Sequence, residues 1–357
     1  MKEEQEIYRI NQLPVLQNQV FTNQKNAFEC TKGDLILVQD MKTGLIFNKA
    51  FDPSLMAYTP DYQNEQALST CFKNHLKEIA GLIGSHFRGC SLIEIGCGKG
   101  RFLEMLHEDG FDICGMDPAY EGNNPLILKK YFTGEKGLQA GGIIMRHILE
   151  HIPDPVDFLM QICDANGGGG KIYIEVPCLD WIRCHNAWFD LFYEHVNYFR
   201  IKDFYNFFGR VYDSGHVFGG QYFYVIADLG TIRRPVRDKT DVFSFPRNFS
   251  EGISGWAHRL KQKTMPSVLW GGSSKGVVFS LLMRRAGAIL DFVIDINPAK
   301  QGKFLPVSGL QVYSPEQGMN RLALGADIIV MNGNYLPEIK QQTKDRFNLW
   351  VVDNEHV

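Results

Sequence analysis

Apolar and polar residues alternate in different ways along the 357-residue chain. The first 75 residues contain short alternating runs, such as DLILVQD and GLIFN, which are broken by Gly, Asn and Asp and are typical of β-strands. The pattern changes at about residue 72. The run CFKNHLKEIAGLIGSHF has apolar residues at helical spacing, and the strand-like runs SLIEI, FDICGMD, GGIIM, KIYIEVP and QYFYVIADL follow it. Strands that alternate with helices predict a parallel α/β sheet.

The segment TIRRPVRDKTDVFSFPRN comes next, and its charge and proline predict a linker that buries little. A second α/β unit follows, with the strand-like runs SVLWGG, FVIDINP and ADIIVMN and a helical SLLMRRAG. The fold class is therefore α/β, with a doubly wound, Rossmann-like central domain. The predicted parts are a small β-rich N-terminal module (1–75), the central domain (76–230), a linker with a helix (231–265) and a second Rossmann-like domain at the C-terminus (266–357).

Composition narrows the class of ligand. A net charge of -3 and a pI near 6.4 give no basic field of the kind that attracts nucleic acid or anionic lipid, so we expect a small polar ligand. The start, MKEEQEIYRI, does not resemble a secretory signal, and no apolar run reaches membrane-spanning length. We therefore expect a cytoplasmic protein. The eight cysteines include no CxxC pair, which favours reduced thiols over structural zinc.

A glycine-rich turn follows the first strand of the central domain. The run IEIGCGKG places Gly96, Gly98 and Gly100 between an apolar strand and the helical RFLEMLHEDG. Backbone without Cβ atoms lets a ligand pass directly over such a turn. Asp117 ends the second strand about 20 residues further on, where a carboxylate can accept hydrogen bonds from both hydroxyls of a ribose.

Two ligands fit this turn: a dinucleotide and S-adenosylmethionine. Glu94 favours S-adenosylmethionine, because an acid two residues before the first glycine can pair with the ligand's amino group but repels a pyrophosphate. The spacing E-x-G-x-G-x-G is also tighter than the dinucleotide pattern G-x-G-x-x-G. The residues expected around the cofactor are Glu94, Gly96, Cys97, Gly98, Gly100, Asp117, Pro118, Arg146 and His147.

The run His147 to His151 spells H-x-x-E-H, which in some metalloproteases places two zinc ligands on one helical turn. Pro153 and Pro155 follow at once, and the apolar GGIIM precedes the run, so we expect the end of a strand and not a long helix. No metal is expected here. At the carboxyl end of a parallel strand, Arg146, His147 and His151 face the cleft in which α/β sheets bind ligands.

Several segments together resemble a known family, the class I methyltransferases with three-part organisation that methylate carbon atoms of nucleotide-linked keto-sugars. The resemblance spans nearly the whole chain, and its closing segments are the most specific. The segments are LPVLQNQVF, GLIFNKAFDPSLMAYTPDY, IEIGCGKGRFLEML, RHILEHIPDP, WFDLFYEHVNYF, WGGSSKGVVFSLL, FVIDINPAKQGKFLP and YSPE. It implies S-adenosylmethionine as cofactor, S-adenosylhomocysteine as its product, and a nucleotide-sugar as substrate.

The resemblance also implies roles for single residues. The family's general base falls on His195, another active-site histidine falls on His151, and a segment near the sugar falls on Gly219, Gly220 and Gln221. A histidine suits the removal of a proton from carbon next to a keto group, because its pKa lies near working pH. We expect Glu194 to orient or polarise this base, and His151 or Tyr193 to hydrogen-bond the enolate oxygen.

The chain departs from the family at four positions or sets of positions. The family holds zinc with four cysteines in its N-terminal module, whereas only Cys30 precedes Cys71 here, so this module must fold without metal. The family's tyrosine before its catalytic segment aligns with Phe192, and Tyr193 replaces its histidine. A second family tyrosine aligns with Asn64, and Tyr62 lies two residues earlier. Tyr62 and Asn64 are expected to contact the substrate.

Other interpretations stay open. Glu194 and His195 can form a polar pair inside an aromatic core, and an O-methyltransferase would use the same histidine on a hydroxyl. The turn GGSSKG, with Asp295 about 20 residues further on, suggests a nicotinamide-dependent oxidoreductase, although Ser273 stands where that fingerprint needs a glycine. Ser273 and Lys275 can instead hold the phosphate of a nucleotide. A non-catalytic S-adenosylmethionine-binding protein is a further alternative.

Overall fold

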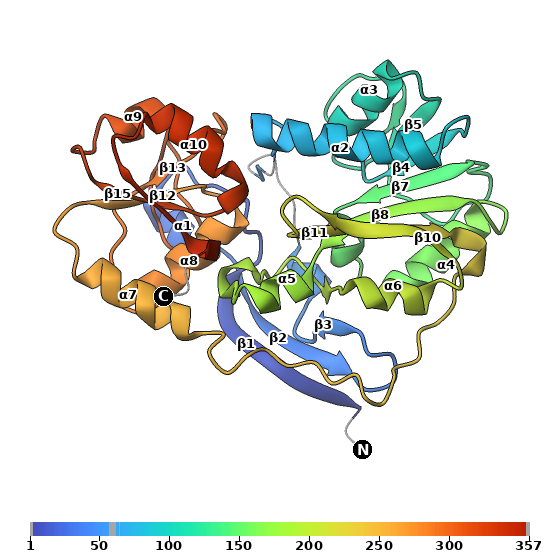
Figure 1. The fold of residues 1–357 in the computed structure, drawn as a ribbon, viewed down its shortest axis with the longest axis horizontal. Helices are drawn as coiled ribbons and strands as arrows, with labels where there is room; N and C mark the ends of the chain where they lie inside the picture. Colours follow the sequence, from blue (N-terminus) through green and yellow to red (C-terminus); the bar gives the residue numbers. More distant parts are fainter. Residues whose placement is uncertain (1–2, 57–61, 64, 355–357) are drawn as a thin grey trace.

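The computed structural model describes residues 3–56, 62–63 and 65–354, which form three β-sheets and the helices around them (Figure 1). Within these residues, no helix combines the length and the apolar character that crossing a membrane requires.

The first sheet has four strands in the order β1-β2-β3-β9, and all its pairs are antiparallel. Its strands are β1 (Glu4–Pro14), β2 (Lys32–Asp40), β3 (Ile46–Asn48) and β9 (Asn197–Tyr198). Between them lie α1 (Gln24–Glu29), which Asn23 caps, and the short helix η1 (Pro53–Leu55). Because β9 comes from the middle of the chain, the sheet joins the N-terminal segment to the central domain.

The central sheet has seven strands in the order β10-β11-β8-β7-β4-β5-β6. Its bounds are β4 (Leu92–Ile95), β5 (Ile113–Met116), β6 (Ile127–Leu128), β7 (Gly142–Arg146), β8 (Lys171–Pro177), β10 (Val211–Val217) and β11 (Tyr222–Asp228). β11 is antiparallel to both of its neighbours, whereas the other pairs are parallel. The strand order reverses at β4, and such a reversal opens a crevice at the carboxyl ends of the strands.

Helices cover both faces of this sheet, with α2 and α3 on one side and α4, α5 and α6 on the other (Figure 1). Their bounds are α2 (Thr70–His86), α3 (Arg101–Glu108), α4 (Pro155–Ala165), α5 (Leu179–Cys184) and α6 (Ile201–Phe207); η2 (Leu149–His151) and η3 (Trp188–Asp190) lie between them. α2 shows why the pattern folds this way: Ser69 caps it, and Phe72, Leu76, Ile79 and Ile83 bury one stripe.

The C-terminal sheet has five parallel strands in the order β14-β13-β12-β15-β16. They are β12 (Ser267–Trp270), β13 (Val293–Ile294), β14 (Val312–Tyr313), β15 (Asp327–Val330) and β16 (Asn348–Val351). The helices are α7 (Glu251–Lys261), α8 (Ser274–Arg285), α9 (Pro315–Met319) and α10 (Leu336–Thr343), and η4 (Leu229–Thr231), η5 (Gly333–Tyr335) and η6 (Val352–Asn354) are single turns.

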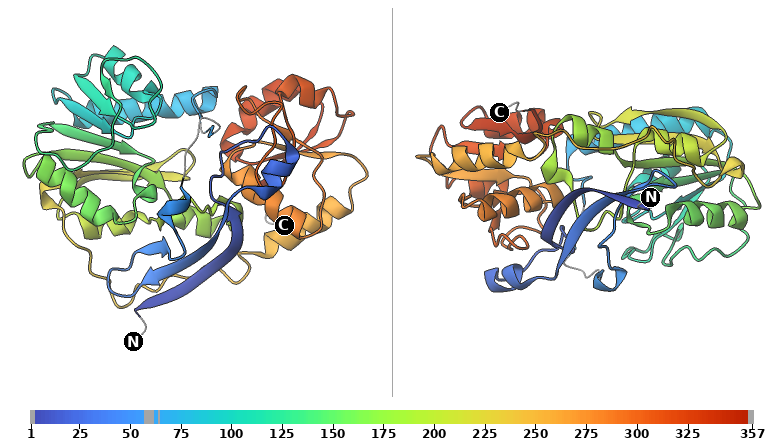
Figure 2. Two further views of the ribbon diagram at one scale, coloured as in Figure 1. Left: turned by 180° about the vertical axis from the view of Figure 1, so that it is seen from behind. Right: turned by 90° about the horizontal axis from the view of Figure 1, so that it is seen from below.

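The β1–β2 hairpin lies across the junction of the two α/β domains (Figures 1 and 2). The guanidinium of Arg285, at the end of α8, donates to the backbone oxygens of Asn11 and Gln12 in β1. On the other side, β3 pairs with β9 of the central domain. Trp188 stacks on Phe279 of α8, with ring centroids 5.5 Å apart. These contacts fix how the two domains face each other.

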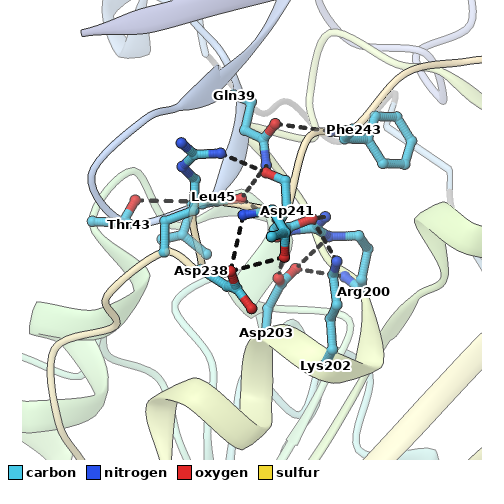
Figure 3. A network of polar contacts seen from close by, with 12 residues as sticks. Gln39, Thr43, Leu45, Arg200, Lys202, Asp203, Asp238, Asp241 and Phe243 are labelled. Atoms are coloured by element: carbon cyan, nitrogen blue, oxygen red, sulfur yellow. Dashed lines mark hydrogen bonds and ion pairs between the residues drawn. The ribbon is translucent and has the colours of Figure 1, made fainter.

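The segment expected to be a linker that buries little, residues 231–248, runs along the first sheet, and most of its residues are exposed or half-buried. Phe243 departs from that expectation, because its side chain is buried. The side chain of Gln39 donates to the backbone oxygen of Asp241 and accepts from the backbone nitrogen of Phe243. The charged and proline-rich sequence concealed this packing because its polar groups find partners in the sheet (Figure 3).

Arg200 is the centre of this junction. Its side chain is 1% exposed, and its guanidinium pairs with Asp203 at 2.8 Å and Asp241 at 2.9 Å and donates to the backbone oxygen of Gly44 (Figure 3). One cation therefore connects the central domain, the segment between η4 and α7 (residues 232–250) and the first sheet.

We expect Arg200→Met to lower the free energy of unfolding by about 3–5 kcal/mol, because it leaves buried carboxylates without their cation. Lys202→Ala is the matched control: Lys202 also contacts Asp241, but its side chain is 52% exposed, and its loss should cost less than about 1 kcal/mol. Urea unfolding followed by circular dichroism measures both values. Equal stability of the two variants would contradict the importance given to Arg200.

Candidate functional site

The turn between β4 and α3 has the backbone that a ligand needs. Gly96, Gly98 and Gly100 all have positive φ, at 75°, 54° and 77°. A Cβ at Gly96 or Gly100 would lie 2.2 Å or 2.4 Å from an isoleucine side chain, whereas a Cβ at Gly98 would meet nothing within 4 Å. Two glycines are thus required by packing, and the third leaves space over the turn for a cofactor.

Asp117 ties this turn to the end of β5. Its Oδ2 accepts from the backbone nitrogen of Gly98 at 2.8 Å, and its Oδ1 accepts from that of Ala119 at 2.8 Å. Pro118 lies between the two. The backbone nitrogen of Cys97 donates to the backbone oxygen of Met116. Burial raises the pKa of the Cys97 thiol, so the sulfur stays protonated. Asp117 and Cys97 are therefore built into the turn itself.

Glu94 is a buried acid beside the cofactor turn, and the charge of Arg146 only partly offsets the effect of burial. Its side chain is 2% exposed, and its Oε2 has no hydrogen-bond partner among the described residues. Burial raises its pKa to about 7. A buried acid of this kind favours a ligand that brings a positive charge, such as the ammonium of S-adenosylmethionine, and disfavours a pyrophosphate.

Glu175, at the end of β8, organises the next part of the strand edge. Its carboxylate is fully buried and accepts from His75 at 3.0 Å, His147 at 3.0 Å, Arg146 at 3.3 Å and Tyr173 at 2.8 Å. Although burial opposes ionisation, Arg146 and the two histidines hold the pKa of Glu175 well below its usual range. Arg146 and His147 are therefore occupied by Glu175. Glu175, like Glu94, is an acid inside an apolar strand, and this signal in the sequence could have identified it as a site residue.

His147 sits in a turn, with φ of 54°, directly after β7. Burial opposes its protonation, but hydrogen bonds to Glu150 and Glu175 raise its pKa to about 9. The expectation that a strand ends here is confirmed, because β7 ends at Arg146 and a single turn, η2, follows.

A cleft of about 280 Å³ lies between the central and C-terminal domains. This is large enough for part of a small polar molecule. His147, Glu150, His151, Glu194, His195 and Tyr222 line it from the central domain; Ser273, Ser274, Lys275 and Asn332 line it from the C-terminal domain; and Gln17, Asn18 and Tyr62 line it from the N-terminal segment. The fold thus gathers predicted residues from distant parts of the chain.

His195 and His151 face each other in this cleft. Their ring centroids are 5.0 Å apart and the rings are nearly perpendicular, at 83°. Nδ1 of His151 lies 3.0 Å from the backbone oxygen of Glu194, which fixes a proton on Nδ1 and leaves a lone pair on Nε2. Burial, and then the neighbouring His151, lower the pKa of His195 to about 3. His195 is therefore neutral at physiological pH with its lone pair free, but the same burial makes it a weaker base than an exposed histidine, contrary to the expectation of a pKa near working pH.

Glu194 connects this pair to the N-terminal segment. Its carboxylate is buried and accepts from the backbone nitrogen of Gln17 at 2.6 Å and from the hydroxyl of Tyr62 at 2.7 Å. Burial raises its pKa. Its contacts suit a residue that orients the backbone beside the histidines.

Tyr193 does not line the cleft, so its assignment to the enolate oxygen is wrong. Its side chain is fully buried, its hydroxyl accepts from the backbone nitrogen of Asp52 at 2.8 Å, and its ring packs against Gly33 and Phe51. Asn64, which was expected to contact the substrate, lies outside the described residues.

Lys275 and Gln221 hold the two domains together. Nζ of Lys275 lies 3.1 Å from Asp190 and 2.9 Å from the side-chain oxygen of Gln221. Gln221 also exchanges hydrogen bonds with Asn332 and does not line the cleft, which corrects its assignment to the substrate. Lys275 lines the cleft, but its charge is already paired.

Lys300 is a buried lysine that the sequence did not reveal. Its side chain is 1% exposed, and Nζ donates to Ser273, to the backbone oxygen of Gly272 and to Asn18. Burial lowers its pKa. It fixes the glycine-rich turn before α8 against the N-terminal segment, and Ser273 is thereby positioned on the cleft wall.

A larger hollow of about 1360 Å³ lies between α2 and α3, lined by residues such as Lys77, Gly81 and Glu108. No candidate residue in the described part of the chain lines it. The larger of the two hollows is therefore not the one in which the candidate site residues gather.

The raised pKa of Glu94 predicts how cofactor affinity depends on pH. Because the acid ionises near pH 7 and the ligand's amino group is cationic, affinity for S-adenosylhomocysteine should increase about tenfold from pH 6 to pH 8. Glu94→Gln should bind more weakly and lose this dependence, whereas the exposed Glu108→Gln should behave like the natural protein. Isothermal titration calorimetry measures these affinities. An unchanged pH profile in Glu94→Gln would remove Glu94 from the cofactor site.

Comparison with known proteins agrees with this geometry. Residues 62–211 match the family model described as a methyltransferase domain. The chain is similar to the C-methyltransferase NovU of Streptomyces niveus, with 24% identity over 296 residues that cover 72% of this chain and 70% of the relative. It is also similar to the ubiquinone biosynthesis O-methyltransferase of Ruegeria pomeroyi, with 30% identity over 99 residues, which are 24% of this chain and 40% of that protein.

Solved structures with a similar fold cover about half of the chain. One is a 1,6-didemethyltoxoflavin-N1-methyltransferase of Burkholderia thailandensis with bound S-adenosylhomocysteine, with 14% identity, a TM-score of 0.34, and coverage of 52% of this chain and 95% of that one. Another is an S-adenosylmethionine-dependent methyltransferase of Aquifex aeolicus, with 16% identity, a TM-score of 0.33, and coverage of 47% and 100%. From the matched domain, the strand order and the cofactor turn, the chain is an S-adenosylmethionine-dependent methyltransferase with a class I methyltransferase domain.

Proposed function

We propose that the protein transfers the methyl group of S-adenosylmethionine to a carbon atom of a nucleotide-linked keto-sugar bound in the cleft between its two α/β domains. We also propose that the chain has three parts, as sugar C-methyltransferases have. One observation carries the proposal: the neutral imidazole of His195 lines a cleft that the methyltransferase domain shares with the Gly-Gly-Ser-Ser-Lys turn of the C-terminal domain. The similarity to NovU over most of the chain supports it.

His195 is the proposed base. The cofactor supplies an electrophilic methyl group on its sulfonium when it is bound. His195 accepts the proton of the carbon next to the keto group, and the resulting enolate carbon would then bond to the methyl group while the methyl–sulfur bond breaks and S-adenosylhomocysteine is left. The low pKa keeps the lone pair of His195 free at physiological pH but weakens the base, and the neighbouring carboxylate of Glu150 acts in the opposite direction by favouring the protonated ring. The walls of the cleft hold the acceptor in position for this step.

His151 has a narrower role than the sequence suggests. Because its Nδ1 proton is given to the backbone oxygen of Glu194, the neutral ring has only a lone pair on Nε2. It can then accept from an acceptor hydroxyl. It donates to an enolate oxygen only when the ring is protonated.

The start of α8 is the proposed site for the phosphates of the nucleotide. Ser273 and Ser274 line the cleft at this helix start, and backbone N–H groups of a first helical turn favour anions. Lys275 contributes less to such a site, since its ammonium is paired with Asp190. Lys300 and Asn18 hold the two serines in place.

O-methylation is the second candidate. It is favoured by the similarity of one segment to ubiquinone biosynthesis O-methyltransferases and by Phe192, which lines the cleft where the sugar enzymes have a tyrosine. The same histidine would then deprotonate a hydroxyl.

Replacing the proposed base should separate binding from chemistry. We expect His195→Ala to lower kcat by about 10²- to 10⁴-fold, because the variant lacks the proposed proton acceptor. Its affinity for S-adenosylhomocysteine should stay close to that of the natural protein. His216→Ala, an exposed histidine on β10, is the control and should keep full activity. A kcat for His195→Ala near that of the control would exclude His195 as the base.

The acceptor is tested with a panel of nucleotide-linked keto-sugars and S-adenosylmethionine that carries a ¹³C methyl group. Mass spectrometry detects methylated products, and NMR shows whether the new methyl is bound to carbon or oxygen. We expect a carbon-bound methyl. An oxygen-bound methyl would favour the second candidate, and no product with any sugar would contradict the proposed substrate class.

A further inference from the structure

Three side chains with metal-binding atoms meet in the cleft. Ligand atoms of Glu150, His151 and His195 all lie within 4.8 Å of one another. From the sequence, no metal is expected at the H-x-x-E-H run, whose ligand pair would have been His147 and His151. In the structure, His147 is hydrogen-bonded to Glu175, and His195 lies beside Glu150 and His151 in its place.

Glu150 has one carboxylate oxygen to spare. Its side chain is 1% exposed; Oε1 lies 3.5 Å from Nδ1 of His147, and Oε2 has no hydrogen-bond partner among the described residues. An unpartnered carboxylate oxygen in the protein interior is costly unless a cation or a proton satisfies it. This oxygen therefore points to a missing partner.

The two histidines are prepared as ligands. His151 donates its Nδ1 proton to the backbone oxygen of Glu194, which is the outer hydrogen bond that metal-ligating histidines usually make, and Nε2 keeps its lone pair. The ring of His195 contacts the rings of His151, Phe192 and Tyr198. Over the described part of the chain, its nitrogens have no hydrogen-bond partner.

We propose that Glu150, His151 and His195 form a site for a divalent cation of the zinc and cobalt class. Two imidazole nitrogens and one carboxylate oxygen are the ligands that such ions take, and the open side of the group faces the cleft, where water or an acceptor oxygen completes the coordination. Bonds of about 2.0–2.2 Å in a tetrahedral site place ligand atoms about 3.4 Å apart, so side chains whose ligand atoms lie up to 4.8 Å apart must move closer together when the cation binds.

The site has a consequence for catalysis, which rests on the proposed function. His195 has one lone pair when it is neutral, and that lone pair cannot hold a cation and accept the proton of the substrate at the same time. Cation binding therefore inhibits methyl transfer, and chelation restores it.

Cobalt(II) tests the site without any acceptor. The whole protein, freed of metal by dialysis against a chelator, is titrated with Co²⁺ and followed by visible absorption and calorimetry. We expect one equivalent to bind with the absorption bands of a low-coordinate cobalt site. Glu150→Gln and His151→Ala should each weaken binding at least about tenfold, whereas His216→Ala should not. Thermal unfolding of each variant checks that it is folded.

Absence of a one-equivalent site, or equal cobalt binding by folded Glu150→Gln and His151→Ala, would overturn the proposal. Inhibition is tested once an acceptor is found: Zn²⁺ should lower turnover in proportion to occupancy of the site. Activation by a cation bound at these residues would overturn the inhibitory role and the assignment of His195 as base together. A failure to find an acceptor affects only the proposed function, because the cobalt titration does not depend on it.

Discussion

The hydrogen bonds of Glu194 are the constraint on which the candidate site depends. Its carboxylate accepts from Gln17 and Tyr62 of the N-terminal segment, and its backbone oxygen accepts from His151. The next residue in the chain is His195. One buried residue thus fixes both histidines and attaches the N-terminal segment to the wall of the cleft. Because the carboxylate is buried, loss of either partner would leave a polar group unsatisfied, which gives this arrangement little freedom to shift.

The second constraint is the set of polar contacts at the junction of the domains, which includes one ion pair. Lys275 with Asp190, Gln221 with Asn332, and Lys300 with Ser273 all cross or border the junction. Asp190, Gln221 and Lys300 are buried, so the domains cannot separate without exposing or unpairing polar groups. The cleft therefore has a defined width, and an acceptor that bridges the domains meets positioned groups on both sides.

The cofactor turn could be predicted from the sequence because its parts are local. Glu94, the three glycines and Asp117 all lie in one strand–helix–strand unit, and their spacing alone defines the ligand's path. Sheet strands such as β4, β7, β8 and β11 also follow from apolar runs. The cleft could not be predicted in this way, since Glu150, Glu175 and Lys300 act through contacts with residues that are far away in the sequence. The burial of Phe243 in a charged segment likewise depends on Gln39, about 200 residues earlier.

The central claim is that His195 removes a proton from the acceptor's carbon inside the cleft. It is tested most directly by incubating the protein in D₂O with S-adenosylhomocysteine and the acceptor, and by following the hydrogen next to the keto group by NMR. Methyl transfer is impossible in this mixture, so any exchange reports proton removal alone. We expect the natural protein to exchange this hydrogen for deuterium and His195→Ala to leave it in place. Exchange that is equally fast in both proteins, or absent from a natural protein that still methylates the acceptor, would contradict the account.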